Sequence, residues 1–313
     1  MAEFDRIDGL FIATQCTFAE RLIFQRSGWK VTVIPVVGKK WATPDVEKAR
    51  IIAKYAVGAA KVHLENAEAI RQTSVDASWA EDSDVDIPAP EGLAYMPFQR
   101  AGIDYASKRA RTLIADPPGL GKTIQAIGTH NKNKMSSVLV VCPASLKINW
   151  SREWRRWDVH GLTVGIAMSI PCREPIFEKD GTRARDPNTK LPLSRTWTEH
   201  SWPDTDVVII NYDMLPAFDD EVKAQRWDMA VFDEAHLLKT ATATRTMCVF
   251  GGKKKARKKR DEATGRMKTI ERAKHLQPIV AGHHLYLTGT PILSKPVELW
   301  TLLRACDPKG LGK

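Results

Sequence analysis

Residues 113–128, LIADPPGLGKTIQAIG, combine residue types and spacing suited to binding a nucleoside triphosphate. An apolar run precedes a glycine-rich turn, and Lys122 and Thr123 then open a segment with the spacing of an amphipathic helix. Backbone N–H groups of such a turn cradle phosphate oxygens, and the helix N-terminus adds its dipole. The Lys122 amine would reach the β- and γ-phosphates, and the Thr123 hydroxyl would bind Mg²⁺. The cradling N–H groups would belong to Gly119, Leu120 and Gly121.

One position in this stretch departs from the common phosphate-loop pattern. That pattern has glycine five places before Gly121, whereas this chain has Asp116 there. The alternative interpretation is an ordinary glycine-rich turn between a strand and a helix.

The stretch MAVFDEAHLLK, residues 229–239, supplies the acids that a nucleotide site needs. Its first four residues predict a buried strand, and Asp233 and Glu234 stand at the C-terminal end, where parallel sheets bind ligands. Asp233 would hold Mg²⁺, directly or through water, and Glu234 would orient or deprotonate the attacking water. We expect both acids one strand over from the glycine-rich loop. Alone, Asp-Glu-Ala-His is a weak signal, because Glu/His pairs also cap helices.

Short apolar runs predict the strands that position these residues. The runs are continuous rather than alternating, as in strands buried on both faces, and helical stretches lie between them. The predicted fold class is therefore α/β, a parallel sheet flanked by helices. The runs are TLIA (112–115), SVLVVC (137–142), DVVIIN (206–211), MAVF (229–232) and HLYLTG (284–289).

The strand and helix signals of residues 1–80 predict a small α/β module before the parallel-sheet lobe. The module would contain a strand over 29–37 and a helix with Thr43 as N-cap and Pro44 as its first residue, continuing to Val57. The acidic, proline-containing stretch EDSDVDIPAPEG predicts a linker. The predicted divisions are 1–80 (module), 81–92 (linker) and 93–313 (lobe), with insertions at about 171–204 and 251–265.

Composition favours a polyanionic partner, nucleic acid first. The 313 residues carry a formal net charge of +10, although one basic tail or loop on a soluble protein is the alternative. The basic run within 253–260 can contact DNA phosphates, act as a localisation signal or be a solvated insertion. Five scattered cysteines without Cys-x-x-Cys predict neither a zinc site nor disulfides. With no leader pattern and no membrane-spanning run, we expect no membrane partner and an intracellular protein, cytoplasmic if prokaryotic or viral, nuclear if eukaryotic.

Together, the Gly-Lys-Thr and Asp-Glu-Ala-His motifs resemble those of helicase superfamily two. LAYMPFQRAGIDYA (93–106) resembles the Q motif of that superfamily, which implies that Gln99 reads the adenine of ATP. Three further stretches look like motifs Ia, Ib and III of the Swi/Snf-type DNA translocases. They are VLVVCPASLKINWSREWRRW (138–157), DVVIINYDML (206–215) and LYLTGTPILSKPVELWTLL (285–303).

Two details refine this resemblance, which covers roughly residues 93–307. RNA helicases of the Asp-Glu-Ala-His type usually have Ser-Ala-Thr where this chain has Leu-Thr-Gly-Thr-Pro, which favours the DNA-translocating branch. The phosphate loop of that family normally reads Asp-Glu-Met-Gly-Leu-Gly-Lys-Thr, so Asp116 agrees, while Pro117 and Pro118 depart and should stiffen the turn. The residues before the lobe resemble, more loosely, the module that precedes the motor in annealing-helicase (HARP-type) relatives.

The resemblance implies a RecA-like P-loop NTPase lobe that uses ATP and Mg²⁺ and, in a complete protein, moves along duplex DNA to remodel or reanneal it. Motif III and the acid motif would couple the nucleotide site to the DNA track, although motif III also reads as a tight strand-end turn. The residues implied for coupling are His236, Thr288, Gly289 and Thr290. The residues implied for DNA-backbone contact, tolerant of sequence, are Ser145, Lys147, Asn211 and Tyr212.

Family motors have a second RecA-like lobe whose arginines complete the ATP site, and few residues follow motif III here. We therefore expect slow hydrolysis until a second lobe is supplied, with the chain a fragment, a split-gene product or a degenerate lobe. Three other functions remain open. They are a restriction-type or RNA-directed motor of the same superfamily, a non-catalytic nucleic-acid-binding remnant, and an unrelated P-loop ATPase, which would not explain Gln99 and Leu-Thr-Gly-Thr-Pro together.

Some chemically suggestive residues have a simpler interpretation. Three tryptophans share one helical face, which predicts packing of that helix on the sheet rather than stacking on bases. Cys142 lies in a predicted strand and is interpreted as a core residue. His283 and His284 are interpreted as strand-edge residues, because no further metal ligands cluster nearby. The tryptophans are Trp150, Trp154 and Trp157.

Overall fold

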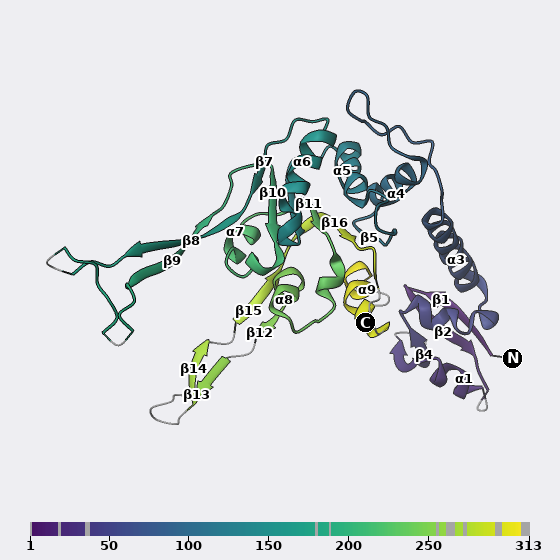
Figure 1. The fold of residues 1–313 in the computed structure, drawn as a ribbon. Helices are drawn as coiled ribbons and strands as arrows, with labels where there is room; N and C mark the ends of the chain where they lie inside the picture. Colours follow the sequence, from purple (N-terminus) through teal and green to yellow (C-terminus); the bar gives the residue numbers. More distant parts are fainter. Residues whose placement is uncertain are drawn as a thin grey trace. The chain divides into compact units, whose positions relative to one another are not determined.

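The computed structural model of the chain divides into two compact units, Met1–Ala80 and Glu81–Lys313 (Figure 1). The residues that the structure describes are 2–17, 20–34, 38–178, 181–187, 189–254, 257–260, 267–271, 274–291 and 296–307. Within those ranges, no helix has both the length and the apolar character needed to cross a membrane.

The first unit contains an antiparallel sheet of four strands in the order β1-β2-β4-β3. Asp8 and Gly9 join β1 to β2 with φ angles of 48° and 80°, the left-handed conformation that Asp-Gly hairpin turns favour. This hairpin was not predicted, although Asp-Gly is its sequence signal. The strands are β1 (Glu3–Ile7), β2 (Leu10–Gln15), β3 (Lys30–Ile34) and β4 (Gly38–Thr43), and the helices are α1 (Arg21–Arg26), α2 (Val46–Arg50), η1 (Ala53–Tyr55) and α3 (Gly58–Ser78).

The helix predicted from Thr43 onward begins two residues later and is broken. The side chain of Asp45, the N-cap of α2, accepts a hydrogen bond from the Glu47 N–H at 3.0 Å. Thr43 remains in β4, and its hydroxyl accepts a hydrogen bond from the Asp45 N–H at 3.1 Å. The prediction failed because Thr43 and Asp45 are both good helix caps. Thr43 is part of β4, so Asp45 caps the helix.

The second unit is built on a six-stranded sheet in the order β5-β16-β11-β6-β10-β7, and every neighbouring pair is parallel. The predicted parallel α/β sheet is therefore confirmed, and only its short edge strand β7 was missed. The strands are β5 (Arg111–Ile114), β6 (Val138–Cys142), β7 (Val164–Ile166), β10 (Val207–Asn211), β11 (Trp227–Phe232) and β16 (Ala281–Leu287).

Helices cover both faces of this sheet, as its continuous apolar strands require (Figure 1). Along β6, Leu139 and Val141 belong to one core, while Val138 and Val140 belong to the other. The first core includes buried residues of α7 (Asp219–Lys223), α8 (Thr244–Phe250) and α9 (Trp300–Cys306). The second includes those of α4 (Pro97–Ser107), α5 (Lys122–Asn133) and α6 (Lys147–Trp157).

Both predicted insertions contain antiparallel strands. In the first, β8 (Met168–Pro175) pairs with β9 (Ser194–Ser201). The second extends past its predicted end at about residue 265, because β12 (Gly251–Lys254) pairs with β15 (Lys274–Pro278) and β13 (Arg257–Arg260) pairs with β14 (Met267–Glu271). Most side chains of the basic run lie outside the described residues, so its three interpretations stay open. The short turns of this unit are η2 (Ala144–Leu146), η3 (Tyr212–Met214), η4 (Ala235–Leu238) and η5 (Pro296–Leu299).

Residues 81–92, predicted as a linker, contain no helix or strand, yet they belong to the second unit and pack on it. Ile87 is buried in the core beneath α4, α5 and α6. The Pro88 carbonyl accepts hydrogen bonds from the Tyr95 hydroxyl at 3.1 Å and from the Asn131 amide at 3.3 Å. This segment therefore contributes to the fold of the lobe.

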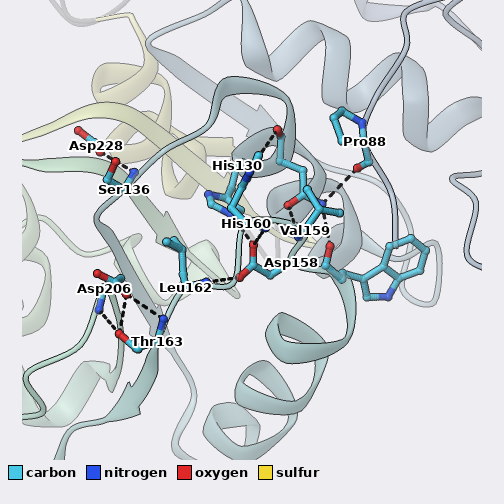
Figure 2. A network of polar contacts seen from close by, with 12 residues as sticks. Pro88, His130, Ser136, Asp158, Val159, His160, Leu162, Thr163, Asp206 and Asp228 are labelled. Atoms are coloured by element: carbon cyan, nitrogen blue, oxygen red, sulfur yellow. Dashed lines mark hydrogen bonds and ion pairs between the residues drawn. The ribbon is translucent and has the colours of Figure 1, made fainter. Parts of the chain in front are cut away.

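Aspartates tie the loops at the edge of the sheet where its strands begin (Figure 2). Asp158, directly after α6, lies 3.0 Å from the Nε2 of His130 and accepts hydrogen bonds from the His160 and Leu162 N–H groups. Burial raises the pKa of Asp158, but these partners outweigh it and leave the pKa lowered. The Asp206 carboxylate accepts hydrogen bonds from the N–H and hydroxyl of Thr163. The Asp228 carboxylate accepts hydrogen bonds from the N–H groups of Ser136 and Ser137.

We expect the free energy of unfolding to fall as the pH is lowered from about 7 to about 5. Burial lowers the pKa of His130 from 6.5, against the opposing influence of Asp158, so the unfolded chain takes up a proton that the native state resists. The stabilisation is complete above pH 6.5 and is lost below it. Thermal unfolding across this range should show a shallower pH slope for His130→Gln, by at most about 1.4 kcal/mol per pH unit.

The exposed His275 provides the control, because His275→Gln should keep the wild-type slope. An unchanged slope in His130→Gln would contradict the role of this buried pair.

Candidate nucleotide-binding site

The loop between β5 and α5 requires its glycines. Gly119 and Gly121 have φ angles of 88° and 76°, in the left-handed region that residues with a β-carbon rarely adopt. A β-carbon at Gly121 would also lie 2.6 Å from the Nε2 of Gln99, too close for any real contact. The predicted strand, tight turn and helix beginning at Lys122 are all present.

Lys122 points back at its own loop. Its ammonium donates hydrogen bonds to the carbonyls of Asp116 at 2.8 Å and Pro117 at 3.1 Å. The positive charge is therefore held at the loop by neutral acceptors, which a more strongly charged group can replace.

Asp116, the residue that departs from the common pattern, ties the loop to the following helix. Its carboxylate accepts a hydrogen bond from the Gln125 amide at 2.7 Å, and Gln125 is completely buried. Gln125 was not among the predicted site residues. Its signal was a polar residue on the apolar face of an amphipathic helix, one turn after Lys122.

Gln99 lies against the phosphate loop. Its amide donates to the Leu120 carbonyl at 3.1 Å, and its oxygen accepts from the Met96 N–H at 3.0 Å. Both ends of this buried side chain thus already have partners within the chain. Gln99 connects the start of α4 to the loop, and its contact with adenine stays a prediction.

Asp233 follows the C-terminal end of β11, and its side chain is held from two sides. One carboxylate oxygen accepts from the Trp150 indole N–H at 2.8 Å, and the other accepts from the Glu234 backbone N–H at 2.9 Å. Burial raises the pKa of this carboxyl, and the charge of Glu234 raises it further, while the Trp150 bond and the charge of Lys122 lower it. Lys122 and Asp233 both follow C-terminal ends of strands in this parallel sheet, and the charge of Lys122 lowers the pKa of Asp233. The expectation that they stand one strand apart is wrong, because β16 runs between β5 and β11.

Glu234 has an unusual backbone for a residue with a side chain. Its φ and ψ angles of 49° and 50° lie in the left-handed region, where it caps η4. Its carboxylate is 3.1 Å from the Nδ1 of His236 and is about one-third exposed. Such conformations cost free energy and concentrate at functional sites, because surrounding contacts must hold them.

The four residues predicted to couple nucleotide and DNA lie together beside both loops. The Nδ1 of His236 is 3.3 Å from the Thr288 hydroxyl, which also accepts a hydrogen bond from the Thr290 N–H at 3.2 Å. The Thr288 N–H donates to the carbonyl of Ile114, the last residue of β5, at 3.0 Å. Gly289 packs so closely on the phosphate loop that a β-carbon there would lie 2.9 Å from Pro118. This turn therefore contacts the acid loop on one side and the phosphate loop on the other.

The four predicted DNA contacts divide into two groups. Ser145 is exposed, and the partly buried Lys147 donates to the Ala167 carbonyl at 3.2 Å. Asn211 is buried, and Tyr212 is only 2% exposed. The Tyr212 hydroxyl donates to the Asp233 carbonyl at 2.8 Å, and burial raises its pKa well above the usual range. Burial thus contradicts a direct DNA contact by Tyr212, which supports the acid loop instead.

The tryptophans of α6 and Cys142 are core residues, whereas the two adjacent histidines lie elsewhere than predicted. All three tryptophans of α6 are buried in the core against the sheet, as predicted. Cys142 is a core residue, and burial raises its pKa to about 12. His283 and His284 lie inside β16 rather than at the edge of a strand. The described residues contain no cluster of three or more His, Cys, Asp or Glu side chains suited to a metal ion.

Residues 95–257 match the model of the SNF2-related domain, a match that includes the phosphate loop and the acid motif. The chain belongs to the SNF2-related family. Motif III of this SNF2-related chain lies beyond the matched range, and its placement rests on the geometry above.

Relatives of this SNF2-related chain are much longer. It is 30% identical over 216 residues to the Caenorhabditis elegans SWI/SNF-related matrix-associated actin-dependent regulator of chromatin subfamily A-like protein 1 homolog, covering 68% of this chain and 24% of that protein. It is 29% identical over 224 residues to the Homo sapiens DNA annealing helicase and endonuclease ZRANB3, covering 70% of this chain and 16% of that protein. The chain thus spans less than a quarter of either relative.

A solved structure is similar as well. The Sulfolobus solfataricus SWI2/SNF2 ATPase core in complex with dsDNA gives a TM-score of 0.46 at 22% identity, covering 73% of this chain and 39% of that chain.

We expect Gln99→Glu to destabilise the nucleotide-free protein by about 1–3 kcal/mol. The substitution keeps the shape but places an oxygen against the Leu120 carbonyl, which loses its donor. Chemical denaturation of the second unit without nucleotide measures the effect, and Gln277→Glu, at an exposed position, is the control. Unchanged stability together with weaker ATP binding would show that Gln99 acts on the nucleotide alone.

Proposed function

We propose that this SNF2-related chain is the ATP-binding lobe of a DNA-dependent ATPase that moves along duplex DNA. The observation that carries the proposal is the geometry at one end of the parallel sheet, where the Lys122 ammonium donates to the phosphate-loop carbonyls and the buried Asp233 carboxylate follows β11. Ligands of open parallel sheets bind beyond the C-terminal ends of the strands, and both residues follow such ends.

The donors available at this edge suit Mg²⁺. The metal prefers oxygen ligands, and the Thr123 hydroxyl and the Asp233 carboxylate are oxygen donors that the two loops supply. Each carboxylate oxygen of Asp233 accepts one hydrogen bond and keeps a further lone pair. Bound with ATP, Mg²⁺ would supply positive charge that neutralises the phosphates.

The residues of the chain would then act by position and charge. The Lys122 ammonium would leave the Asp116 and Pro117 carbonyls for phosphate oxygens, since a charge-assisted hydrogen bond is stronger than a neutral one. The N–H groups of Gly119, Leu120 and Gly121 would cradle the phosphates. The Glu234 carboxylate, held beside His236, would orient the attacking water and accept its proton.

Motif III is suited to report the state of the nucleotide. A shift of the Glu234 carboxylate would reach Thr288 through His236, and a shift of the phosphate loop would reach Gly289 through Pro118. Two contacts from separate loops thus converge on one short turn. We propose that this turn passes the change to the DNA-binding side of the lobe.

Duplex DNA is the track that the chain's charge and relatives favour. The net charge of +10 favours a polyanion, and one relative is named a DNA annealing helicase. Contacts through Ser145 and Lys147 would engage the phosphate backbone, so binding should tolerate sequence and weaken with salt. The first unit, residues 1–80, is proposed to help recognise the DNA substrate.

A second RecA-like lobe is proposed to complete the site. Among the described residues, no arginine forms a hydrogen bond or ion pair with Lys122, Asp233 or Glu234. Arginines that stabilise the charge developing on a γ-phosphate are worth about 10³–10⁵ in rate. Another lobe would supply them, as the resemblance to the Swi/Snf-type motors implies.

Lys122→Ala should abolish measurable ATP binding, because it removes the only cation that the described residues bring to the phosphate loop by hydrogen bonds. Isothermal titration with ATP and Mg²⁺ measures this. Lys132→Ala, at the far end of the same helix and paired with Asp104, should keep wild-type affinity. Unchanged affinity in Lys122→Ala would remove the central assignment.

Duplex DNA should stimulate ATP hydrolysis strongly only when a second lobe is added to the 313-residue chain. Steady-state phosphate release, compared among duplex DNA, single-stranded DNA and RNA, tests both the DNA track and the arginines proposed for a second lobe. Strong stimulation of the chain by itself would contradict the need for the second lobe, and preference for RNA would contradict the DNA track.

A further inference from the structure

Trp150 differs from the other tryptophans of α6 in one respect. Trp150 and Trp154 are both fully buried in the same core, and Trp157 is nearly so. The indole N–H groups of Trp154 and Trp157 have no hydrogen-bond partner among the described residues. The Trp150 N–H donates to the Asp233 carboxylate at 2.8 Å. Core packing by itself explains the positions of Trp154 and Trp157. The Trp150 ring packs in the same core and also directs its N–H at a carboxylate.

The Trp150 N–H is one of two hydrogen-bond donors that the described residues bring to the Asp233 carboxylate. The Glu234 N–H holds one oxygen of the Asp233 carboxylate, which still leaves the group free to rotate about that contact. A second donor on the other oxygen fixes the plane of the carboxylate. An indole is a donor only and carries no charge, so it neither binds a metal nor neutralises the acid.

We propose that Trp150 is a positioning residue that orients the Asp233 carboxylate toward Mg²⁺ in the nucleotide site. This inference rests on the proposed function, since it needs Asp233 to act on the metal side. Helix α6 suits the role because Trp154 and Trp157 anchor it in the core, so the indole meets the acid at a defined place. Groups that orient metal ligands in this way typically contribute about 10- to 100-fold to metal affinity.

The test measures how far Mg²⁺ strengthens nucleotide binding. The dissociation constant of a fluorescent ATP analogue is measured in EDTA and in Mg²⁺. The readout is the dissociation constant in EDTA divided by the dissociation constant in Mg²⁺. Trp150→Phe keeps the aromatic packing and removes the N–H, and it should reduce this ratio by about 10-fold or more. Trp154→Phe is the matched control, since its indole N–H has no described partner, and it should leave the ratio unchanged while lowering the unfolding temperature.

A double variant shows whether Trp150 acts through the Asp233 carboxylate or by disturbing the fold in general. If Trp150 acts through Asp233, adding Trp150→Phe to Asp233→Ala should change the ratio no further. A further loss in that background would overturn the inference, as would an unchanged ratio in Trp150→Phe alone. Wild-type protein whose nucleotide affinity ignores Mg²⁺ would instead overturn the proposed function, so the two failures are distinct.

A measurement on wild-type protein needs no variant to fold. The ¹⁵N-labelled indole signal of Trp150 should shift when Mg²⁺ is added to the ATP-bound protein, because the carboxylate that accepts its bond gains a metal. The Trp154 signal should stay in place. A Trp150 signal that does not respond to Mg²⁺ would overturn the inference.

Discussion

The structure depends on bringing a lysine and a buried carboxylate to one edge of a parallel sheet. Parallel pairing sends the C-terminal ends of β5 and β11 to the same side, so the loops that carry Lys122 and Asp233 leave the sheet at one end although many residues separate them. Burying a carboxylate is costly unless hydrogen bonds and opposite charge offset the lost hydration. Trp150, the Glu234 N–H and the charge of Lys122 provide that offset, and the pKa of Asp233 nonetheless stays raised. A buried carboxylate whose pKa is raised would be stabilised by a further nearby cation, and this favours the metal–nucleotide site that we propose.

The phosphate loop is held in shape by its neighbours. Gln99 binds its Leu120 carbonyl, Gln125 binds its Asp116 carboxylate, and Pro118 packs on Gly289. A loop that is already ordered loses less conformational entropy on binding a ligand than a free one. The same contacts connect the loop to α4, α5 and motif III, so a shift in any of these elements alters the site. At the opposite end of the strands, aspartate carboxylates accept hydrogen bonds from the N–H groups of neighbouring loops (Figure 2).

Much of the fold could be predicted because its signals are local. Apolar runs marked five of the six parallel strands, since a strand buried on both faces must be apolar throughout. Errors arose where two local signals competed or a signal was passed over. Thr43 and Asp45 are both good helix caps, and only the pairing of β4 decides between them. Asp8-Gly9 is a hairpin signal that went unused, and residues 81–92 read as a linker although Ile87 is a core residue.

The sequence by itself determined the chemistry of the site. A phosphate loop requires glycines, a lysine and a hydroxyl at set spacing, and a following apolar strand delivers its acids to the binding edge, because these rules act within a few residues of one another. Tertiary structure alone decided which distant residues the side chains at this site contact. That Trp150 donates to Asp233, that Tyr212 turns inward to the acid loop rather than out to DNA, and that β16 runs between the two binding strands all depend on strand order and helix packing. Those contacts join residues far apart in the chain, and no local pattern encodes which distant side chain a buried donor will meet.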